Sequence, residues 1–377
     1  MASLPAARPA RRALHAAPAP PPSPFLATWR RRWHGATQRS RAAAAAQKKS
    51  QNRVLVPVAT GTEEMEAVVL VDVLRRAGAS VIMASVEESR AVTCSRGVRI
   101  VADATMSEVV DETAEFDAVV LPGGMPGTKR LRDSEALCQL IEKHDAKDGL
   151  LGAICAAPAV VLRDIGLLDG KRATCHPDFQ RQLATSMSFN GTFNGRTVVD
   201  GNVVTSQGPG TAFEFALLLV EEMFGRVASE EVARPMLVPS NVNETMLTCF
   251  DDVEAYAKPY SPSTPKVLVP IANGTEEMEA VILVDVLRRA GIEVIVASVE
   301  KTMQVTAANR VTLQADCSIS DCQRHHIGSF DGIFLPGGMP GAERLRDSSV
   351  LMEILGKHKK DNRLYGAICA APVVALQ

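Results

Sequence analysis

Two cysteines of the chain lie in the same unusual surroundings. The segment GAICAAP occurs at 152–158 and again at 366–372, so Cys155 and Cys369 each follow a short apolar run. A cysteine at a sharp strand-to-helix turn exposes its sulfur above the sheet, and the positive end of the following helix favours the thiolate. Because the thiolate is the nucleophile, the pattern predicts reactive cysteines. A buried structural thiol is the commoner fate of a free cysteine, and we assign it to the other six.

A glutamate and a glycine turn precede each cysteine. The segment GTEEMEA contains Glu66 in the first copy and Glu279 in the second, and LPGGMPG follows in both. Glu66 is expected one turn into a helix, either solvated or pointed at the sulfur to move protons. The backbone N–H groups of Gly123 and Gly124 could receive an oxyanion, and Ala156 leaves room beside the sulfur for a small substrate. Glu63 and Glu64 are better explained as a cap and a first-turn charge.

One histidine is a candidate partner of the first cysteine. His176 lies in ATCHPDF, directly after an expected short strand at 171–175. A histidine near a thiolate can act as general base or acid, and a surface histidine is an equally good interpretation of the sequence.

Alternating strand and helix patterns must position these residues. Short apolar runs at 53–60, 80–85, 118–121, 150–154 and 203–206 predict buried parallel strands. We expect helices after them, with Thr60 and Glu63 as a capping box for the first, and with later helices at 156–163 and 211–224. An edge segment at 234–239 could end the sheet. In parallel sheets the ligand site lies at the carboxyl ends of the strands, where the glutamate, glycines and cysteine all fall.

The motifs repeat, so the chain is predicted to be a tandem duplication. We expect a disordered leader at 1–50, a complete domain at 52–235, a linker at 236–265 and a second domain at 266–377. Arg163 of the first copy corresponds to Gln377, so the second copy has no counterpart of His176 or of the later strand and helix. We therefore expect the second domain to be marginally stable and poorly active, with a splice form or an incomplete gene model as the source of the truncation.

Composition excludes several classes of protein. The chain is 46% hydrophobic, has no stretch of 18 apolar residues and carries a formal charge of −2. The first 50 residues hold ten Lys or Arg and no acid, which leaves the remainder acidic and without a basic patch for nucleic acid. The eight cysteines form no CxxC pair, so a zinc or iron–sulfur site is not expected, and without a secretory signal the thiols should be reduced.

The first 50 residues predict an organelle address. They are rich in Ala, Arg and Pro and lack the apolar core of a secretory signal, as is typical of a transit peptide. The opening MAS and the Ala/Pro/Ser composition favour the chloroplast over the mitochondrion. If the segment is instead a disordered tail or follows a misassigned start codon, the protein would belong to the cytosol or nucleus.

These motifs together resemble the DJ-1/PfpI superfamily, and within it the DJ-1 branch and its tandem plant members. The resemblance rests on GTEEME, VDVLRRAG, LPGG, AICAAP, CHP and SQGPGTAFEFA. It implies a flavodoxin-like α/β sandwich with a mainly parallel sheet, duplicated in tandem. It also implies that the reactive cysteine falls on Cys155 and Cys369, the site glutamate on Glu66 and Glu279, and the site histidine on His176. Arg96 matches an arginine that lines the pocket, where the second copy has Asn309.

The resemblance further implies an activity. Family members convert methylglyoxal or glyoxal to the hydroxy acid without a cofactor, as glyoxalase III, and are linked to deglycation, redox sensing and chaperone activity. Members are typically dimers, so we expect either a homodimer or a pairing of the two domains within the chain, with possible protein clients. The alternative to an enzyme is a sensor that acts through oxidation of the elbow cysteine. A protease or amidotransferase is a weaker interpretation, because Ala156 stands where many such proteases have a histidine.

Overall fold

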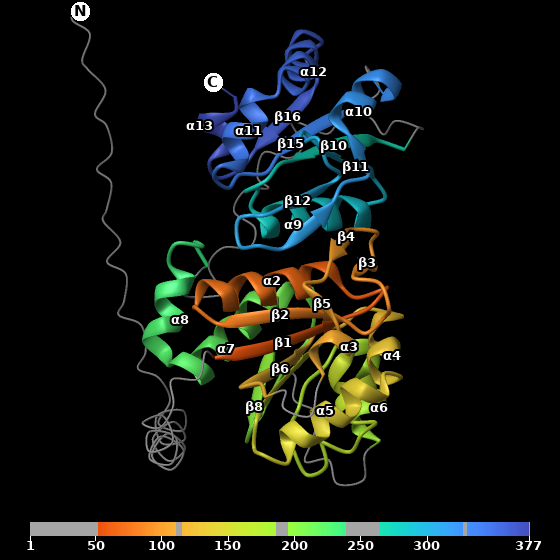
Figure 1. Ribbon diagram of the computed structural model, residues 1–377, viewed down its shortest axis with the longest axis vertical. Coiled ribbons are helices and arrows are strands. Elements are labelled where there is room, and N and C mark those ends of the chain that lie inside the picture. The colour runs from red at the N-terminus through yellow and green to blue at the C-terminus, as the bar shows by residue number, and fades with distance from the viewer. Residues whose placement is uncertain (1–51, 111–114, 186–194, 239–263, 327–329, 377) are drawn as a thin grey trace, which may run out of the picture. The chain divides into compact units, whose positions relative to one another are not determined.

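The computed structural model describes residues 52–110, 115–185, 195–238, 264–326 and 330–376. The chain divides into two units, Met1–Ser50 and Gln51–Gln377, and every described residue belongs to the second. The expected transit peptide at 1–50 and most of the expected linker at 236–265 therefore lie outside the described residues. Within the second unit two α/β repeats follow each other along the chain (Figure 1).

The first repeat is built on a seven-stranded sheet in the order β5-β2-β1-β6-β7-β9-β8. All neighbouring strands run parallel except β8 and β9. Helices cover both faces of the sheet (Figure 1). The strands are β1 (Arg53–Val58), β2 (Ser80–Ser85), β5 (Ala104–Thr105), β6 (Ala118–Leu121), β7 (Leu150–Ile154), β8 (Thr197–Asp200) and β9 (Val203–Ser206). The helices are α2 (Glu64–Arg76), α3 (Met106–Val109), α4 (Gly127–Arg132), α5 (Glu135–Asp145), α6 (Gln180–Ala184), α7 (Ala212–Phe224) and α8 (Arg226–Ala233).

Strand β1 shows why the sheet has a core on each face. Val54, Val56 and Val58 pack with the apolar residues of α2 and α7, whereas Leu55 packs with those of α4 and α5. Successive side chains of a strand point to opposite faces, so a continuous apolar run buries both. The sheet is therefore held from two sides, which fixes the carboxyl ends of its strands.

The second repeat has the same start but fewer described strands. Its sheet runs β14-β11-β10-β15-β16, all parallel. The strands are β10 (Lys266–Ile271), β11 (Glu293–Ser298), β14 (Cys317–Ser318), β15 (Gly332–Leu335) and β16 (Leu364–Ala367). The helices are α9 (Glu277–Arg289), α10 (Ile319–His326), α11 (Gly341–Asp347), α12 (Ser349–Lys360) and α13 (Ala371–Val374). Within the described ranges β16 pairs with β15 alone, so its outer edge is open.

The two repeats join through hairpins and helices. Strands β3 (Ala91–Thr93) and β4 (Arg99–Val101) of the first repeat continue into β13 (Thr312–Gln314) and β12 (Gln304–Thr306) of the second, which gives one antiparallel four-stranded sheet. The register places Ile100 opposite Leu313. Helices α2 and α9 also pack against each other. The glutamate-bearing helices of both repeats therefore lie at their common boundary.

Helix α2 begins differently from the sequence prediction. Its N-cap is Glu63, whose carboxylate accepts the N–H of Glu66 at 2.7 Å, and Glu276 does the same in α9. Thr60 does not cap the helix, because its hydroxyl donates to Glu87 instead. The helix ends at Arg76, and Gly78 shortly after it lies in the left-handed region at φ +87°.

Three other sequence predictions were wrong. The helix expected at 156–163 is a short π-helix at Pro158–Leu162, where proline contributes no N–H. The expected strand at 171–175 is reduced to a single bridge at Ala173. Residues 234–238, the described part of the expected edge segment, form no strand and follow α8 as a turn. Strand β9 and helix α7 lie where the sequence predicted them.

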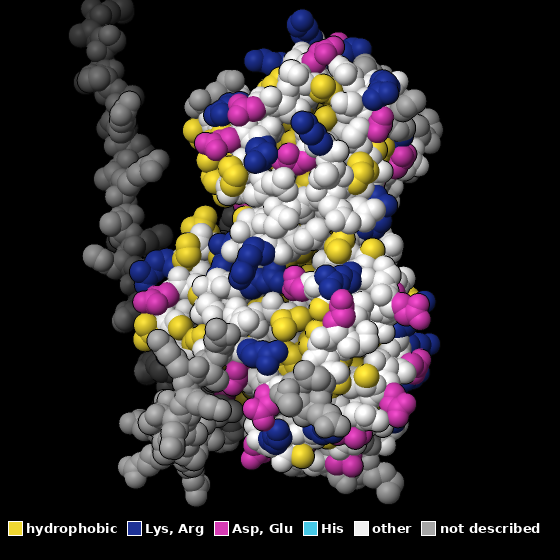
Figure 2. Space-filling view, viewed as in Figure 1, with side chains coloured by type: hydrophobic (Ala, Val, Ile, Leu, Met, Phe, Trp, Pro, Cys, Tyr) yellow, Lys and Arg dark blue, Asp and Glu magenta, His cyan; other side chains and the backbone are white. Residues whose placement is uncertain are grey.

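The surface carries both signs of charge. On the face drawn in Figure 2, acidic side chains lie among the basic ones. No helix in the described ranges is long and apolar enough to cross a bilayer.

Candidate functional site

Cys155 lies on the turn that leaves β7. Its φ is +64°, a left-handed conformation that costs a non-glycine residue roughly 1–3 kcal/mol. Two backbone hydrogen bonds hold it there: its N–H donates to the carbonyl of Ser206 at 3.0 Å, and its carbonyl accepts the N–H of His176 at 2.8 Å. The elbow is thus clamped by two segments that follow Arg163 in the chain.

Glu66 is buried beside this cysteine. It lies in the first turn of α2, has no exposed surface, and its Oε2 accepts the N–H of Gly123 at 2.7 Å. The carboxyl also shares a hydrogen bond with the Cys155 thiol. A Cβ at Gly123 would lie 2.5 Å from the Cβ of Cys155 and 2.8 Å from Oε2 of Glu66. The glycine is therefore needed for glutamate and cysteine to meet, and Glu66 is not the solvated carboxylate that the sequence left open.

Burial shifts both groups toward their protonated forms. It raises the pKa of Glu66 to about 7, while the Gly123 N–H, Cys155 and Arg289 work in the opposite direction. Burial and the neighbouring Glu66 also raise the pKa of the Cys155 thiol, against the N–H of Gly124. This result is opposite to the expected thiolate, because burial and the neighbouring carboxyl disfavour a charged sulfur.

The oxyanion donors differ from those expected. The N–H of Gly123 is taken by Glu66, and that of Gly124 is directed at the sulfur of Cys155. Ala156 is fully buried directly after the cysteine. Its N–H stays the predicted donor to an oxyanion at this turn.

His176 approaches the same place from another segment. A Cβ built on Gly208 would lie 3.5 Å from Cδ2 of His176 and 4.0 Å from Oε1 of Glu66. The Nδ1 atom of His176 accepts the N–H of Asp178 at 3.3 Å, and its side chain is 37% exposed. Oε1 of Glu66 is buried and has no hydrogen-bond partner in the described part of the chain. The structure therefore brings together glutamate, cysteine and histidine, with one carboxylate oxygen unused.

Arg96 has a different setting from the one the sequence suggested. Its backbone N–H donates to Glu64 at 2.9 Å, and its carbonyl accepts a hydrogen bond from Arg288 of the second repeat. Its side chain is exposed, and among the described residues it forms no hydrogen bond with Glu66 or Cys155. The hydrogen bond to its carbonyl links the first repeat to the second.

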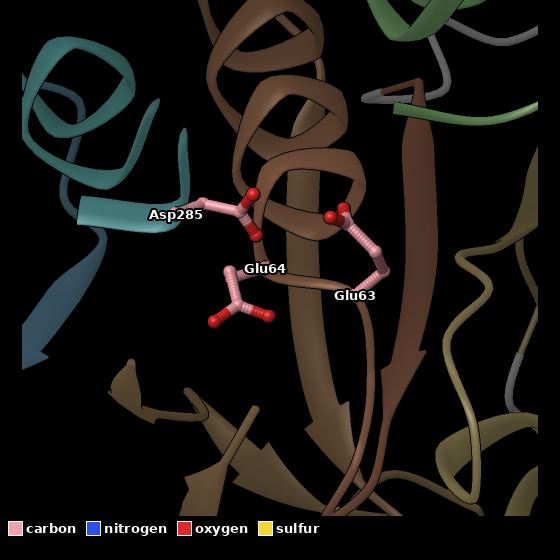
Figure 3. A group of neighbouring side chains, drawn as sticks. All are labelled: Glu63, Glu64 and Asp285. Atoms are coloured by element: carbon pink, nitrogen blue, oxygen red, sulfur yellow. The ribbon is translucent and has the colours of Figure 1, made fainter. Parts of the chain in front are cut away.

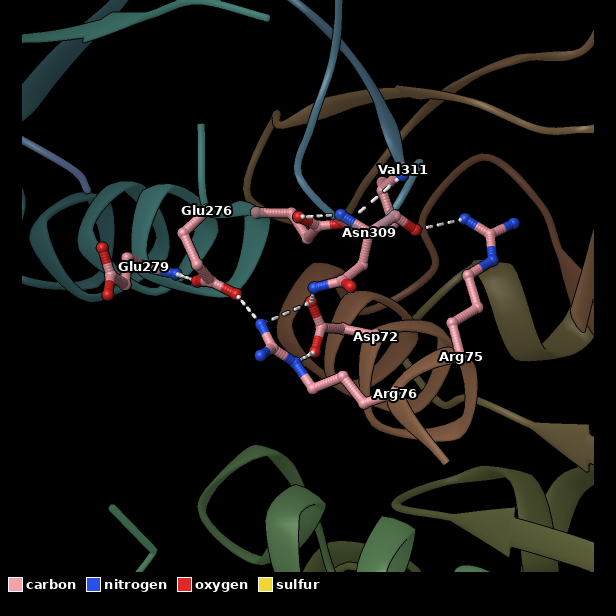
Figure 4. A network of polar contacts seen from close by, with 8 residues as sticks. Asp72, Arg75, Arg76, Glu276, Glu279, Asn309 and Val311 are labelled. Atoms are coloured by element: carbon pink, nitrogen blue, oxygen red, sulfur yellow. Dashed lines mark hydrogen bonds and ion pairs between the residues drawn. The ribbon is translucent and has the colours of Figure 1, made fainter. Parts of the chain in front are cut away.

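Sequence reasoning missed an arginine that the second repeat supplies. Arg289 of α9 donates to the carboxyl of Glu63 at 2.6 Å. The same carboxyl caps α2 by accepting the N–H of Glu66. Reciprocally, Arg76 of α2 donates to Glu276 at 2.9 Å (Figure 4). Each arginine also pairs with an aspartate four residues earlier on its own helix. This Asp-to-Arg spacing, repeated in VDVLRR, was the available signal.

Three carboxylates gather where α2 meets α9. Glu63, Glu64 and Asp285 offer oxygen atoms within 4.8 Å of one another (Figure 3). Burial raises the pKa of Glu63 to about 9, with Glu66 and Asp285 adding to the shift. Such oxygens could hold a cation, but all three groups already accept protein hydrogen bonds: Glu63 and Asp285 from Arg289, and Glu64 from Ser95 and Arg96.

The second copy repeats the local geometry in an open setting. Glu279 Oε2 accepts the N–H of Gly337 at 2.7 Å, and Cys369 has φ +60°. Cys369 is exposed and Glu279 is half-buried. Within the described ranges, no residue of the second repeat takes the place of Ser206 or His176 beside this cysteine.

Comparison with known proteins assigns the fold and its two copies. The model of the DJ-1/PfpI family matches residues 52–222 and again 265–377. The chain belongs to the DJ-1/PfpI family. Protein DJ-1 homolog B of Arabidopsis thaliana is 41% identical over 341 residues, which cover 90% of this chain and 75% of that protein. DJ-1 homolog A of the same plant is 40% identical over 86% of this chain and 80% of its own length.

Single-domain relatives align with half of the chain. The glutathione-independent glyoxalase DJR-1.2 of Caenorhabditis elegans is 36% identical over 46% of this chain and 89% of its own length. The crystal structure of DJ-1beta of Drosophila melanogaster shares 40% identity, covers 50% of this chain and all of that structure, and has a TM-score of 0.48. The family match over both repeats supports a duplicated flavodoxin-like α/β architecture, and the sheets of both repeats are mainly parallel.

Proposed function

We propose that the protein is a cofactor-independent glyoxalase, which converts methylglyoxal or glyoxal to the hydroxy acid at Cys155. The observation that carries the proposal is the buried Glu66, whose pKa is about 7 and whose carboxyl contacts the Cys155 thiol. A general base works best when its pKa lies near the working pH. Its free Oε1 leaves it a position from which to move a second proton.

The reaction begins with addition of the thiol to the aldehyde. The sulfur of Cys155 bonds to the aldehyde carbon of methylglyoxal, and the thiol proton passes to the carboxylate of Glu66. Glu66 then passes this proton to the aldehyde oxygen, which becomes the hydroxyl of a hemithioacetal. The N–H of Ala156 would donate to this oxygen while it carries negative charge. Because only 9% of Cys155 is exposed, the turn admits a small aldehyde more readily than a bulky one.

An isomerisation and a hydrolysis complete the cycle. A base, Glu66 or His176, removes the proton from the former aldehyde carbon to give an enediol, and the proton returns on the neighbouring carbon. The product is the thioester of lactate. Water then adds to the thioester carbonyl, the carbon–sulfur bond breaks, and lactate leaves with the thiol restored. Carbon is oxidised at one position and reduced at the next, so the steps need no outside oxidant.

A relative with a named activity supports the proposal. The glutathione-independent glyoxalase of C. elegans aligns with one repeat of this chain. That glyoxalase is named as independent of glutathione, which suits a site that supplies its own cysteine thiol.

The test is to follow the product in heavy water. Full-length protein and methylglyoxal, without glutathione, should give lactate by NMR. Deuterium at its second carbon would report exchange of the enediol proton with solvent. The Cys155→Ala variant should give none above the uncatalysed rate. Full turnover by that variant, or no lactate from the wild type, would contradict the mechanism.

The same contact favours a second candidate function. A protonated Glu66 could donate a hydrogen bond to a sulfinate on Cys155, so the cysteine could act as a peroxide sensor. Mass spectrometry after mild peroxide treatment separates the two candidates. Selective sulfinate at Cys155 together with negligible glyoxalase turnover would favour the sensor.

We also propose import into the chloroplast, on the acid-free, arginine-rich composition of residues 1–50. A fluorescent fusion of this segment should enter plastids, and accumulation in mitochondria or the cytosol would overturn the assignment.

A further inference from the structure

A second reactive arrangement lies outside both glutamate–cysteine sites. The sulfur atoms of Cys317 and Cys322 are 2.7 Å apart. Cys317 is the first residue of β14 and is half-buried, whereas Cys322 lies in α10 and is fully buried. The proposed glyoxalase reaction uses neither thiol.

Rigid local structure brings the two sulfur atoms together. Strand β14 pairs with β11, with Cys317 opposite Ala297. The Ser318 hydroxyl accepts the N–H of Asp321 at 3.1 Å and donates to its carboxylate at 2.7 Å, which fixes the first turn of α10. Because strand and helix are tied in this way, Cys322 is directed back toward the strand. The approach of the two thiols therefore follows from the fold of this corner.

Their separation is suited to a disulfide. A disulfide bond is about 2.05 Å long, so each sulfur needs to move by only a few tenths of an ångström. The two thiols are also unequal. The Cys322 thiol hydrogen-bonds to the sulfur of Cys317 and lowers the pKa of Cys317, while its own pKa is raised. The more exposed cysteine is thus the better nucleophile.

The first repeat contains no such pair. Ala104 occupies the place of Cys317, since it pairs with Ala84 as Cys317 pairs with Ala297. Val109 stands at the position of Cys322, five residues further along. The repeated fold can therefore be built without these cysteines, and a purely structural requirement does not explain them.

We propose that Cys317 and Cys322 form a redox-active dithiol that a hydroperoxide converts into a disulfide. The thiolate of Cys317 attacks the peroxide, a sulfur–oxygen bond forms, the oxygen–oxygen bond breaks, and water or an alcohol leaves. The sulfur of Cys322 then attacks the sulfenic acid, and a second water leaves with the proton of Cys322. Two thiols lose two electrons and two protons, and the peroxide gains them. A dithiol reductant then reduces the disulfide by thiol–disulfide exchange and restores both thiols.

The disulfide would join strand β14 to helix α10 at the edge of the second sheet. Amides of both elements should then exchange more slowly with solvent than in the reduced protein, because local opening would have to separate cross-linked segments. Oxidation of the dithiol would thus slow amide exchange in the second repeat and leave the surroundings of Cys155 unchanged.

The test uses one peptide. Residues 311–324 lie between Arg310 and Arg324, so trypsin releases both cysteines together. Full-length reduced protein is treated with a few equivalents of hydrogen peroxide, alkylated under denaturing conditions and digested without reductant. The proposal predicts that this peptide loses two hydrogens and both alkyl groups, and regains the alkyl groups after dithiothreitol. Cys138 of the first repeat should stay alkylated.

Two controls sharpen the result. In urea the disulfide should form at about one tenth of the rate in buffer or lower, because folding fixes the two sulfurs at reacting distance. The Cys322→Ser variant should leave Cys317 as sulfenic or sulfinic acid, without the loss of two hydrogens. Retention of both alkyl groups in the peroxide-treated wild type, or equal rates with and without urea, would overturn the proposal.

Discussion

The two cysteine sites share a motif and differ in what surrounds it. In both, the glutamate Oε2 accepts a glycine N–H at 2.7 Å, and the cysteine has a positive φ near 60°. Yet Cys155 is 9% exposed, whereas Cys369 is exposed to solvent. The motif alone therefore builds the contact between glutamate and cysteine, and more distant segments determine its environment.

The difference arises from elements packed beside the elbow. In the first repeat β9 pairs with β7, and α7 packs on α2. In the described part of the second repeat, β16 has an open edge, and Val286 of α9 is 51% exposed where Val73 of α2 is fully buried. Burial is what raises the pKa of Glu66 to about 7. A complete acid–base site thus depends on segments that contain neither motif.

The largest effect on activity should separate the two glutamates. Glu66→Gln keeps an oxygen for the Gly123 N–H but cannot take the thiol proton, so turnover should fall by roughly 10²- to 10⁴-fold. Glu279→Gln, the matched change in the open site, should leave turnover within about twofold of wild type. Steady-state kinetics with methylglyoxal measure both. Equal losses would mean that burial does not distinguish the sites.

A second pair of variants tests burial itself. Leu150 in β7 is 5% exposed and Leu364 in β16 is 60% exposed, although both begin the strand that leads to a cysteine. Leu150→Ala should cost the first repeat about 2–5 kcal/mol of unfolding free energy. Leu364→Ala should change the second by about 0.5 kcal/mol or less. Hydrogen exchange resolved along the chain measures the stability of each repeat separately. A large loss of unfolding free energy in the second repeat of Leu364→Ala would show that the Leu364 side chain is buried in solution.

The sequence predicted the fold because local patterns control it. The apolar runs that became β1, β2, β6, β7 and β9 were recognisable, and the positions of Glu66, Gly123 and Cys155 at strand ends followed from a parallel sheet. The predicted thiolate did not follow, because the prediction left out the burial of the sulfur and the carboxyl of Glu66 beside it, both of which raise the pKa of the Cys155 thiol.

Contacts between the repeats were beyond sequence reasoning. The hydrogen bond from Arg289 to Glu63 joins residues 226 positions apart, and no local pattern links them. The thiol pair of Cys317 and Cys322 depends on the direction of α10 relative to β14, which composition and spacing do not fix.

The smallest effect should come from the arginines at the boundary. Glu66 acts as a base, so kcat/KM should rise with pH through about 7 as its carboxyl loses its proton. Arg289 lowers the pKa of Glu66, so Arg289→Gln should move this rise to higher pH. The loss near neutral pH should be about fivefold at most, because the Arg289 side chain is 36% exposed and solvent screens its charge.

Arg76→Gln is the matched control for this change. It removes the mirror-image pair with Glu276 of the second site, and should leave the pH profile unchanged. If both variants shifted the pH profile of kcat/KM alike, the cause would be a disturbed contact between the repeats and not the charge of Arg289 near Glu66.

The most direct test of one complete site in a chain with two elbow cysteines is a kinetic comparison of Cys155→Ala, Cys369→Ala and the double variant on methylglyoxal. The account predicts that Cys155→Ala falls to the level of the double variant, while Cys369→Ala keeps nearly all wild-type turnover. Substantial turnover by Cys155→Ala that disappears only in the double variant would show that the open site is active and would contradict the account.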